Sequence, residues 1–167
     1  MNNYNRNIED ESMVNAIELL KEEPRFVFEG TEKDYEDHIV LNADLICDAL
    51  GLPKIKIIEQ QRQIRFDRNQ IIMDIVIRHI DGSITILEVK KSNDKNPWTS
   101  TNAQVQALGQ MLLYRNVVKI ATGVTPRVAL ITDKLFYRTQ AVFIDTELPL
   151  ALIEFQRDRL FMPYENW

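Results

Sequence analysis

A β-hairpin signal in the middle of the chain constrains the fold more than any other feature. Residues 71–80 and 83–91 are rich in isoleucine and valine, and an Asp-Gly pair separates them. Such a pair between apolar segments is typical of a tight turn, so we predict two adjacent antiparallel strands. Each strand holds an acidic residue in an apolar setting, Asp74 in the first and Glu88 in the second. A buried carboxylate is costly unless it is paired or binds a metal ion, so these acids need a partner.

The length of the turn decides whether the two acids meet. A two-residue turn places Asp74 opposite Val89, so that the aspartate points away from Glu88. A three-residue turn at 80–82, with its glycine in the left-handed region, places Asp74 opposite Glu88, with Cβ atoms about 4.5–5.5 Å apart. We expect the three-residue turn or an equivalent bulge. Its spacing suits two carboxylates that share a Mg²⁺ ion.

A nearby lysine offers an ordinary structural alternative. Lys90 shares a strand face with Glu88, since the two are two residues apart. Either acid could form an ion pair with this lysine, or both could face water on a half-exposed sheet. For one acid alone this interpretation would be preferred. Two acids and a lysine on adjacent strands favour a functional site.

The remaining periodicity predicts a mixed α/β domain. Because no linker or repeat divides the chain, we expect a single domain over residues 1–167. A polar loop over 92–102 follows the hairpin. Helical spacing of apolar residues predicts an acidic N-terminal helix over 10–23, a helix capped by Thr31 that ends near residue 50, and a helix over 103–119. Segments of strand character lie at 54–60, at 127–132, and at 140–145 and 149–155 within a C-terminal region of strands over about 140–162.

Composition narrows the classes of function. The 167 residues carry a net charge of −5, distributed as −9 in residues 1–53, +7 in 54–138 and −3 in 139–167. A basic centre between acidic ends hints at a polyanionic partner. The single cysteine, Cys47, excludes an internal disulfide and a cysteine-based zinc cluster. No apolar stretch is long enough to span a membrane and no secretory signal is visible, so we expect a cytoplasmic protein without a membrane partner.

The acidic hairpin is part of a larger pattern. Asp74, thirteen further residues and then Glu88-Val89-Lys90 resemble the motif of the PD-(D/E)XK nuclease superfamily, with Met73 where the motif's name has proline. The helix that begins near Glu32 and the glutamine-and-tyrosine segment 106–114 resemble two further elements of that family. The resemblance covers roughly residues 30–132. It implies a restriction-endonuclease-like fold, in which a central mixed β-sheet is flanked by helices.

The resemblance also implies an activity and a metal site. A member of this family would be a metal-dependent nuclease that hydrolyses phosphodiester bonds with Mg²⁺ or Mn²⁺, and DNA is favoured over RNA as the substrate. The metal would be held by Asp74, Glu88 and the Val89 carbonyl, with Glu32 as a ligand directly or through water. Glu36 lies one helical turn from Glu32 and is an alternative to it.

Two further residues acquire roles from the same resemblance. Lys90 would orient or deprotonate the attacking water, or stabilise charge in the transition state. Gln110 would position the water or a phosphate, and we prefer it to Gln106 because of its spacing to Tyr114. A surface amide on the helix is the ordinary alternative for Gln110.

Basic and aromatic residues near the motif are candidates for nucleic-acid contacts. Lys91, Lys95 and Trp98 combine charge with a ring that can stack on a base, and Arg65 precedes the Asp74 strand. Alternatively, Trp98 packs on the sheet, the lysines are merely solvated, and the arginine protects an edge strand. The rival function is a catalytically inactive module with a nuclease fold that binds or assembles in a larger complex. A homodimer is also possible.

Overall fold

The computed structural model describes residues 28–66, 68–93, 95–143, 146–157 and 159–167. The helix predicted over 10–23 lies outside these residues. Six strands form one mixed sheet in the order β1-β2-β3-β4-β5-β6, in which the central pairs β3–β4 and β4–β5 are parallel and the outer pairs are antiparallel. The strands are β1 (Ile55–Phe66), β2 (Asn69–His79), β3 (Ile84–Lys90), β4 (Arg127–Thr132), β5 (Ala151–Gln156) and β6 (Arg159–Glu165). The expected mixed α/β architecture is confirmed.

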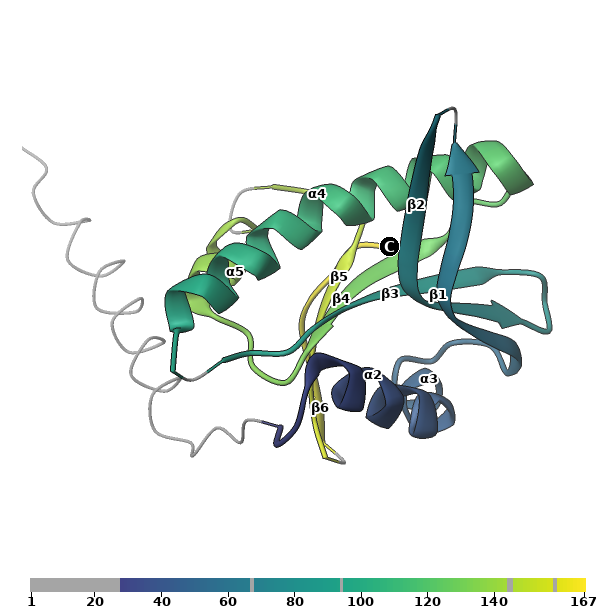
Figure 1. Cartoon of the computed structure of the whole chain (residues 1–167). Helices are drawn as coiled ribbons and strands as arrows, with labels where there is room; N and C mark the ends of the chain where they lie inside the picture. Colours follow the sequence, from purple (N-terminus) through teal and green to yellow (C-terminus); the bar gives the residue numbers. More distant parts are fainter. Residues whose placement is uncertain (1–27, 67, 94, 144–145, 158) are drawn as a thin grey trace, which may run out of the picture.

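Helices cover both faces of the sheet (Figure 1). The long helix α4 (Pro97–Thr122) packs on one face, where Met111 and Val118 join a cluster with Ile86 and Leu130. The helices α2 (Glu32–Leu41) and α3 (Ala43–Ala49) pack on the other face, where they share a second cluster with residues of β2 to β5. A short helix, α5 (Tyr137–Ala141), connects β4 to β5. None of the helices in the described ranges is both long and apolar enough to cross a membrane.

The turn between β2 and β3 has three residues, as predicted. The N–H of His79 donates to the Ser83 carbonyl at 2.9 Å, and the N–H of Gly82 donates to the His79 carbonyl at 3.1 Å. Gly82 has a φ of 86°, which glycine adopts without the steric penalty of a side chain. The resulting register pairs Ile75 with Leu87, and Asp74 therefore lies across from Glu88.

The structure corrects the predicted helix over 31–50. Thr31 does cap its start, in a capping box with Asp34, but Asn42 divides the segment into α2 and α3. The Asn42 side-chain amide donates to the His38 carbonyl at 2.8 Å, and its own backbone leaves the helical region at a φ of −105° and a ψ of 13°. Asparagine competes in this way with the helical hydrogen bonds, which explains the break.

Two further boundaries differ from the prediction. The segment 92–102 is not all loop, because α4 begins at Pro97 after Asn96, whose side chain accepts the N–H of Thr99. The strand predicted over 140–145 is wrong where it overlaps α5, and residues 144–145 lie outside the described part. The buried amide oxygen of Gln104 accepts the N–H of Phe136 and the Thr139 hydroxyl, which holds this segment in a helical turn. The strand predicted at 149–155 is confirmed as β5, and the predicted C-terminal region of strands also contains β6.

Candidate active site

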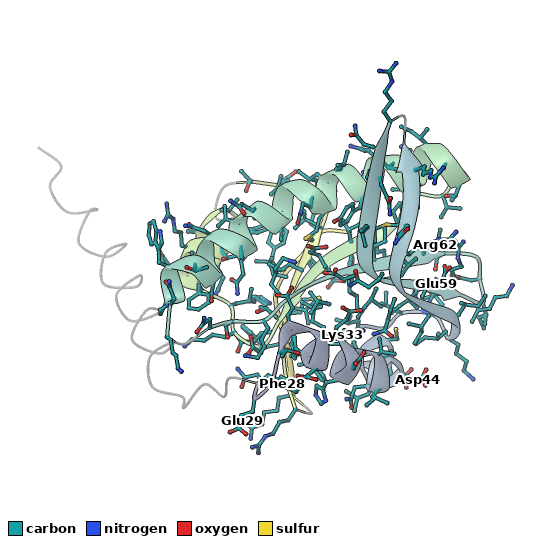
Figure 2. The ribbon with its side chains drawn as sticks, viewed as in Figure 1. Phe28, Glu29, Lys33, Asp44, Glu59 and Arg62 are labelled. Atoms are coloured by element: carbon teal, nitrogen blue, oxygen red, sulfur yellow. The ribbon has the colours of Figure 1, made fainter. Side chains whose placement is uncertain are left out.

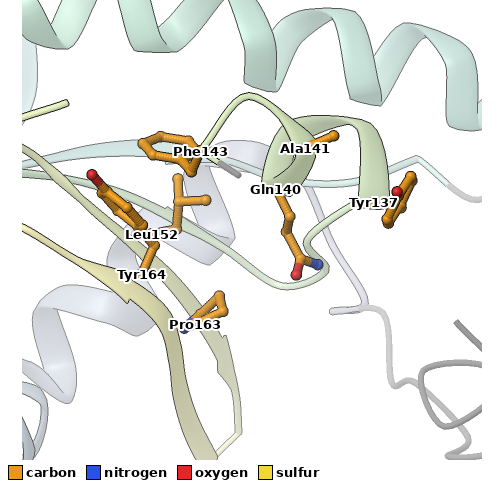
Figure 3. A pocket seen from close by; sticks show the side chains of 7 residues that line it. All are labelled: Tyr137, Gln140, Ala141, Phe143, Leu152, Pro163 and Tyr164. Atoms are coloured by element: carbon orange, nitrogen blue, oxygen red, sulfur yellow. The ribbon is translucent and has the colours of Figure 1, made fainter. Parts of the chain in front are cut away.

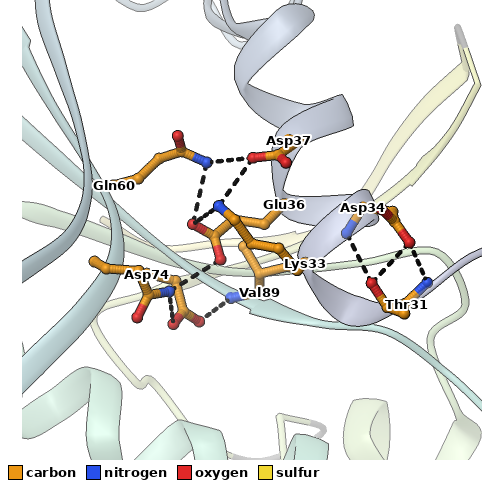
Figure 4. Close-up of polar contacts among 9 residues, drawn as sticks. Thr31, Lys33, Asp34, Glu36, Asp37, Gln60, Asp74 and Val89 are labelled. Carbon is orange, nitrogen blue, oxygen red and sulfur yellow. Dashed lines mark hydrogen bonds and ion pairs between the residues drawn. The ribbon is translucent and has the colours of Figure 1, made fainter.

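The candidate site lies where β2 separates from β3. Their backbone pairing reaches Ile75 and Leu87, and beyond this pair the Asp74 carboxylate accepts the N–H of Val89 at 2.9 Å through Oδ2 (Figure 4). A side chain thus takes the place of the next carbonyl acceptor in the ladder. Met73 and Val76 join the same core cluster although they are three residues apart, so the alternation of faces is interrupted at Asp74.

Lys90 brings together three oxygen atoms of the predicted site. Its Nζ donates to Glu88 Oε1 at 2.7 Å and to the Val89 carbonyl at 2.9 Å, and it lies 3.8 Å from Asp74 Oδ2. The ion pair that was the ordinary alternative is therefore present. The same contacts place one positive charge among the three oxygens that the resemblance assigns to a metal ion. Within the part of the chain that the structure describes, no three His, Cys, Asp or Glu side chains are grouped closely enough to hold a metal by themselves.

The buried Glu88 carboxylate is strongly perturbed. Only 3% of the residue is exposed, and its Oε2 atom has no hydrogen-bond partner. Burial, and then repulsion by Asp74, raise the pKa of Glu88 to about 7, although Lys90 acts in the opposite direction. For Lys90, burial lowers the pKa, but attraction to Glu88, Asp74 and Glu32 outweighs it and leaves the pKa raised. The pair thus keeps a lysine charged beside a carboxylate that is only half ionised near neutral pH.

Both candidate glutamates of α2 lie near the site. Glu32 is exposed, and its Oε2 accepts the N–H of Lys91 at 3.2 Å. Glu36 is only 4% exposed and points toward Asp74, as Figure 4 shows. Gln61 bridges these two carboxylates, with Nε2 donating to Glu36 Oε2 at 2.9 Å and to Asp74 Oδ1 at 3.2 Å. The structure thus links Glu36 to Asp74 and brings Glu32 close to the lysine side of the site.

Sequence reasoning missed Gln61 and gave no role to Tyr114. No sequence signal identifies Gln61, because its contacts depend on a helix about 25 residues away in the chain. The Tyr114 hydroxyl donates to the Ile72 carbonyl at 2.9 Å, and burial together with the charges of Glu88 and Asp74 raises its pKa. Its position in the glutamine-and-tyrosine segment was the available signal.

The glutamines of α4 have different surroundings. Gln106 and Gln110 are both exposed, and Gln110 lies one helical turn from Tyr114. Gln104 is buried, and its amide donates to the Thr132 hydroxyl at 3.2 Å and to the Lys134 carbonyl at 2.7 Å. The buried glutamine therefore has a structural role, and a role for Gln110 stays a prediction.

The predicted nucleic-acid contacts are not gathered at one place. Trp98 is 63% exposed in the first turn of α4, where the Arg138 guanidinium lies 4.6 Å from the centre of its ring. At a rise of 1.5 Å per residue, its backbone lies about 24 Å along the helix from that of Tyr114. Lys95 is exposed in the loop before α4, whereas Lys91 directly follows the acidic strand. The structure therefore separates Trp98 from the acids and keeps Lys91 close to them.

The arginines of β1 lie on the long β1–β2 hairpin. Arg65 is exposed and pairs in register with Gln70 near the end of the hairpin. Arg62 forms an ion pair with Glu59 at 3.0 Å, and the two are labelled on this hairpin in Figure 2. Among the described residues, Arg62 is therefore the one of these two arginines with an ion-pair partner.

A cavity of about 270 Å³ lies elsewhere in the fold, between α5 and β6 (Figure 3). It is mainly apolar and aromatic, and its lining includes Phe143, Leu152 and Tyr164. None of the predicted site residues contributes to it. The cavity is therefore separate from the site around Asp74 and Glu88.

Comparison with known proteins bears on the fold. No protein-family model matches the chain, and no curated protein matches its sequence. Among solved structures, the chain is similar to a repair endonuclease from Pyrococcus abyssi, with 19% identity, a TM-score of 0.51, and coverage of 79% of this chain and 50% of that one. It is also similar to the structure of an EndoMS-dsDNA2 complex, with 17% identity, a TM-score of 0.48, and coverage of 77% and 46%.

The chain spans about half the length of these two structures, and at such low identity the likeness concerns the fold. The similarity to the repair endonuclease agrees with the mixed sheet and the flanking helices described above. The chain therefore has the restriction-endonuclease-like fold that its resemblance to the PD-(D/E)XK superfamily implies.

Proposed function

We propose that the chain is a metal-dependent nuclease that hydrolyses phosphodiester bonds, with DNA favoured over RNA as its substrate. One observation carries the proposal: Asp74, Glu88 and the Val89 carbonyl direct oxygen atoms toward the same cation, which is Lys90 Nζ. The preference for DNA comes from the family resemblance, and the similarity to a repair endonuclease supports it.

The chemistry of these donors fits a hard divalent cation. Mg²⁺ and Mn²⁺ favour oxygen ligands, and the site offers two carboxylates and a carbonyl. The buried Oε2 of Glu88, which has no hydrogen-bond partner, is a further donor. When bound, such a cation would supply a water nucleophile at neutral pH and neutralise charge on the phosphate.

The residues of the protein would have separate roles in binding the cation and the substrate. Asp74, Glu88 and Val89 would hold the cation, with a glutamate of α2 beside them. Lys90 would leave its contact with Glu88 and stabilise negative charge on the phosphate, since a preorganised ammonium in a partly buried site is effective there. Gln110 and Lys91 would contact the substrate close to these groups.

Cleavage assays test the proposal. Purified protein is incubated with single- and double-stranded DNA and with RNA, with Mg²⁺, Mn²⁺ or EDTA. We expect cleavage of DNA that requires the cation and falls at least 100-fold in Asp74→Ala and in Lys90→Ala. Asp48→Ala, which removes an exposed acid of α3, is the matched control and should cleave like the wild type. Undiminished cleavage by Lys90→Ala would assign the activity to another site or to a contaminant.

The inactive binding module remains the second candidate, because Lys90 pairs with both acids. The two functions differ in their response to divalent cations. A nuclease site gains thermal stability with Mn²⁺, and Asp74→Ala abolishes the gain. In an inactive binding module the two acids would only pair with Lys90. Such a module shows neither the gain in thermal stability nor cleavage.

A further inference from the structure

Gln61 has an unusual backbone conformation for its position. Its φ of 49° lies in the left-handed region, which an L-residue with a side chain adopts only at a cost. Among the described residues, Arg157 is the other non-glycine residue with a positive φ, and it lies in the turn between β5 and β6. Gln61 lies instead within the twelve-residue strand β1, between residues that pair with Ile75 and Met73. It is therefore opposite Asp74.

This backbone conformation changes the direction in which the Gln61 side chain points. Successive residues of a regular strand point to opposite faces of the sheet. Gln60 and Gln61 nevertheless both donate to the Glu36 carboxylate, at 3.2 Å and 2.9 Å. The positive φ of Gln61 thus breaks the alternation and directs two consecutive amides to one carboxylate. Unfavourable backbone conformations persist where the surroundings determine them, and they cluster at functional sites.

The Gln61 side chain also holds Asp74 in place. The second hydrogen bond of its Nε2 goes to Asp74 Oδ1, while Asp74 Oδ2 accepts the N–H of Val89. Both oxygens of this acid are therefore held, one by each neighbouring strand. The single amide also keeps Glu36 and Asp74 within two hydrogen-bond lengths of each other, although their negative charges repel.

We propose that Gln61 is a positioning residue for the acidic pair: it sets the orientation of Asp74 and holds Glu36 beside it. This inference rests on the proposed function, because the oriented acids are those that would hold the divalent cation. Groups that hydrogen-bond to metal-binding carboxylates orient them, and their loss commonly lowers metal affinity about 10–100-fold.

The substitution Gln61→Gly separates this role from a purely structural one. Glycine accepts a positive φ without strain, so the variant removes the amide and keeps the backbone. Mn²⁺ affinity is measured by calorimetry on the full chain, and thermal stability is measured in EDTA. Arg157→Gly relieves the same kind of strain in the turn between β5 and β6, and it serves as the matched control.

We expect Gln61→Gly to bind Mn²⁺ at least tenfold more weakly than the wild type, with an unchanged or raised melting temperature. The control variant should keep the wild-type affinity within about threefold. Wild-type affinity in Gln61→Gly would overturn the inference and leave the proposed function standing. An equal loss in Arg157→Gly would also overturn it, because the loss would then follow from glycine itself. If the wild type neither binds Mn²⁺ nor cleaves DNA, the proposed function fails and the inference fails with it.

Discussion

At the scale of single residues, Glu88 is an acid whose charge destabilises the fold. Its carboxylate is buried, one oxygen lacks a partner, and its pKa of about 7 lies well above the ordinary value of 4.5. The folded chain therefore binds this proton more tightly than the unfolded chain does. The contribution of Glu88 to stability therefore falls by roughly 3 kcal/mol as pH rises from about 4.5 to about 7.

The isosteric substitution Glu88→Gln tests this cost. Glutamine resembles the protonated carboxyl and cannot ionise, so we expect the variant to be more stable than the wild type at pH 8 in EDTA. The melting temperature should rise by about 5–10 °C at pH 8 and by much less at pH 5. Thermal denaturation at the two pH values measures the difference. A stability gain that does not change with pH would show that Glu88 is not the titrating group.

Gln61 shows what sequence could not reveal at this scale. The acids and Lys90 were identifiable because they interrupt a regular apolar pattern within one hairpin, and the turn chemistry around Gly82 is local. Gln61 does not interrupt an apolar pattern, because a glutamine is common in an exposed strand. Its conformation depends on Glu36, which a helix on one face of the sheet presents to it.

At the scale of elements, Tyr114 links α4 to β2 just past the point where β2 leaves β3. Its hydroxyl donates to the Ile72 carbonyl, and its ring is buried in the cluster beneath α4. The contact fixes the helix against the strand that carries Asp74. The position of the helix therefore depends in part on one hydrogen bond to a carbonyl of β2.

Removal of this hydroxyl should destabilise the fold modestly. We expect Tyr114→Phe to lose about 1 kcal/mol of unfolding free energy, because the Ile72 carbonyl loses its donor while the ring stays packed. Urea denaturation measures the loss as a lower midpoint with an unchanged slope. Tyr137→Phe, which alters an exposed tyrosine of α5, is the control and should leave the midpoint in place. An unchanged midpoint in Tyr114→Phe would mean that water replaces the lost donor.

The elements themselves were predictable where the signal was local. Periodicity and turn residues indicated the hairpin, the cap at Thr31 and the long helix. The short helix α5 was not predictable, because Gln104 stabilises it from 32 residues before Phe136. The start of α4 differs from the prediction because polar residues such as those around Asn96 are typical of a loop, whereas here Asn96 caps the helix. That boundary also placed Trp98 closer to the acids than it lies.

At the scale of the whole molecule, charge is distributed unevenly. The net charge of −5 combines acidic ends with a central segment of +7, and this segment includes the β1–β2 hairpin and the acidic strand. Binding of a polyanion to such a surface depends on salt, because each neutralised phosphate releases a counterion. Arg62 and Arg65 of the hairpin are both exposed, and Arg62 is also held in an ion pair, so the two cations can be compared on one element.

Salt titrations distinguish the two arginines. In EDTA, where no cleavage is expected, duplex DNA binding is followed by fluorescence anisotropy from 50 to 200 mM salt. We expect Arg65→Ala to reduce the slope of log affinity against log salt by about 1, as for the loss of one phosphate contact. Arg62→Ala should change it less, because that side chain is held in an ion pair with Glu59, an acid that it shares with Arg78. Equal slopes in the wild type and Arg65→Ala would place the DNA away from the hairpin.

The three-residue turn has a consequence for how this sequence can diverge. Substitutions at 80–82 change local strain, but they leave the pairing of β2 with β3 as it is, provided the left-handed position is kept. Deletion of one residue shortens the turn to two and shifts every pair by one, which rotates Asp74 away from Glu88. The turn should therefore accept point changes more readily than insertions or deletions. In related chains, the length of the turn would therefore indicate whether the two acids face each other better than its amino-acid composition would.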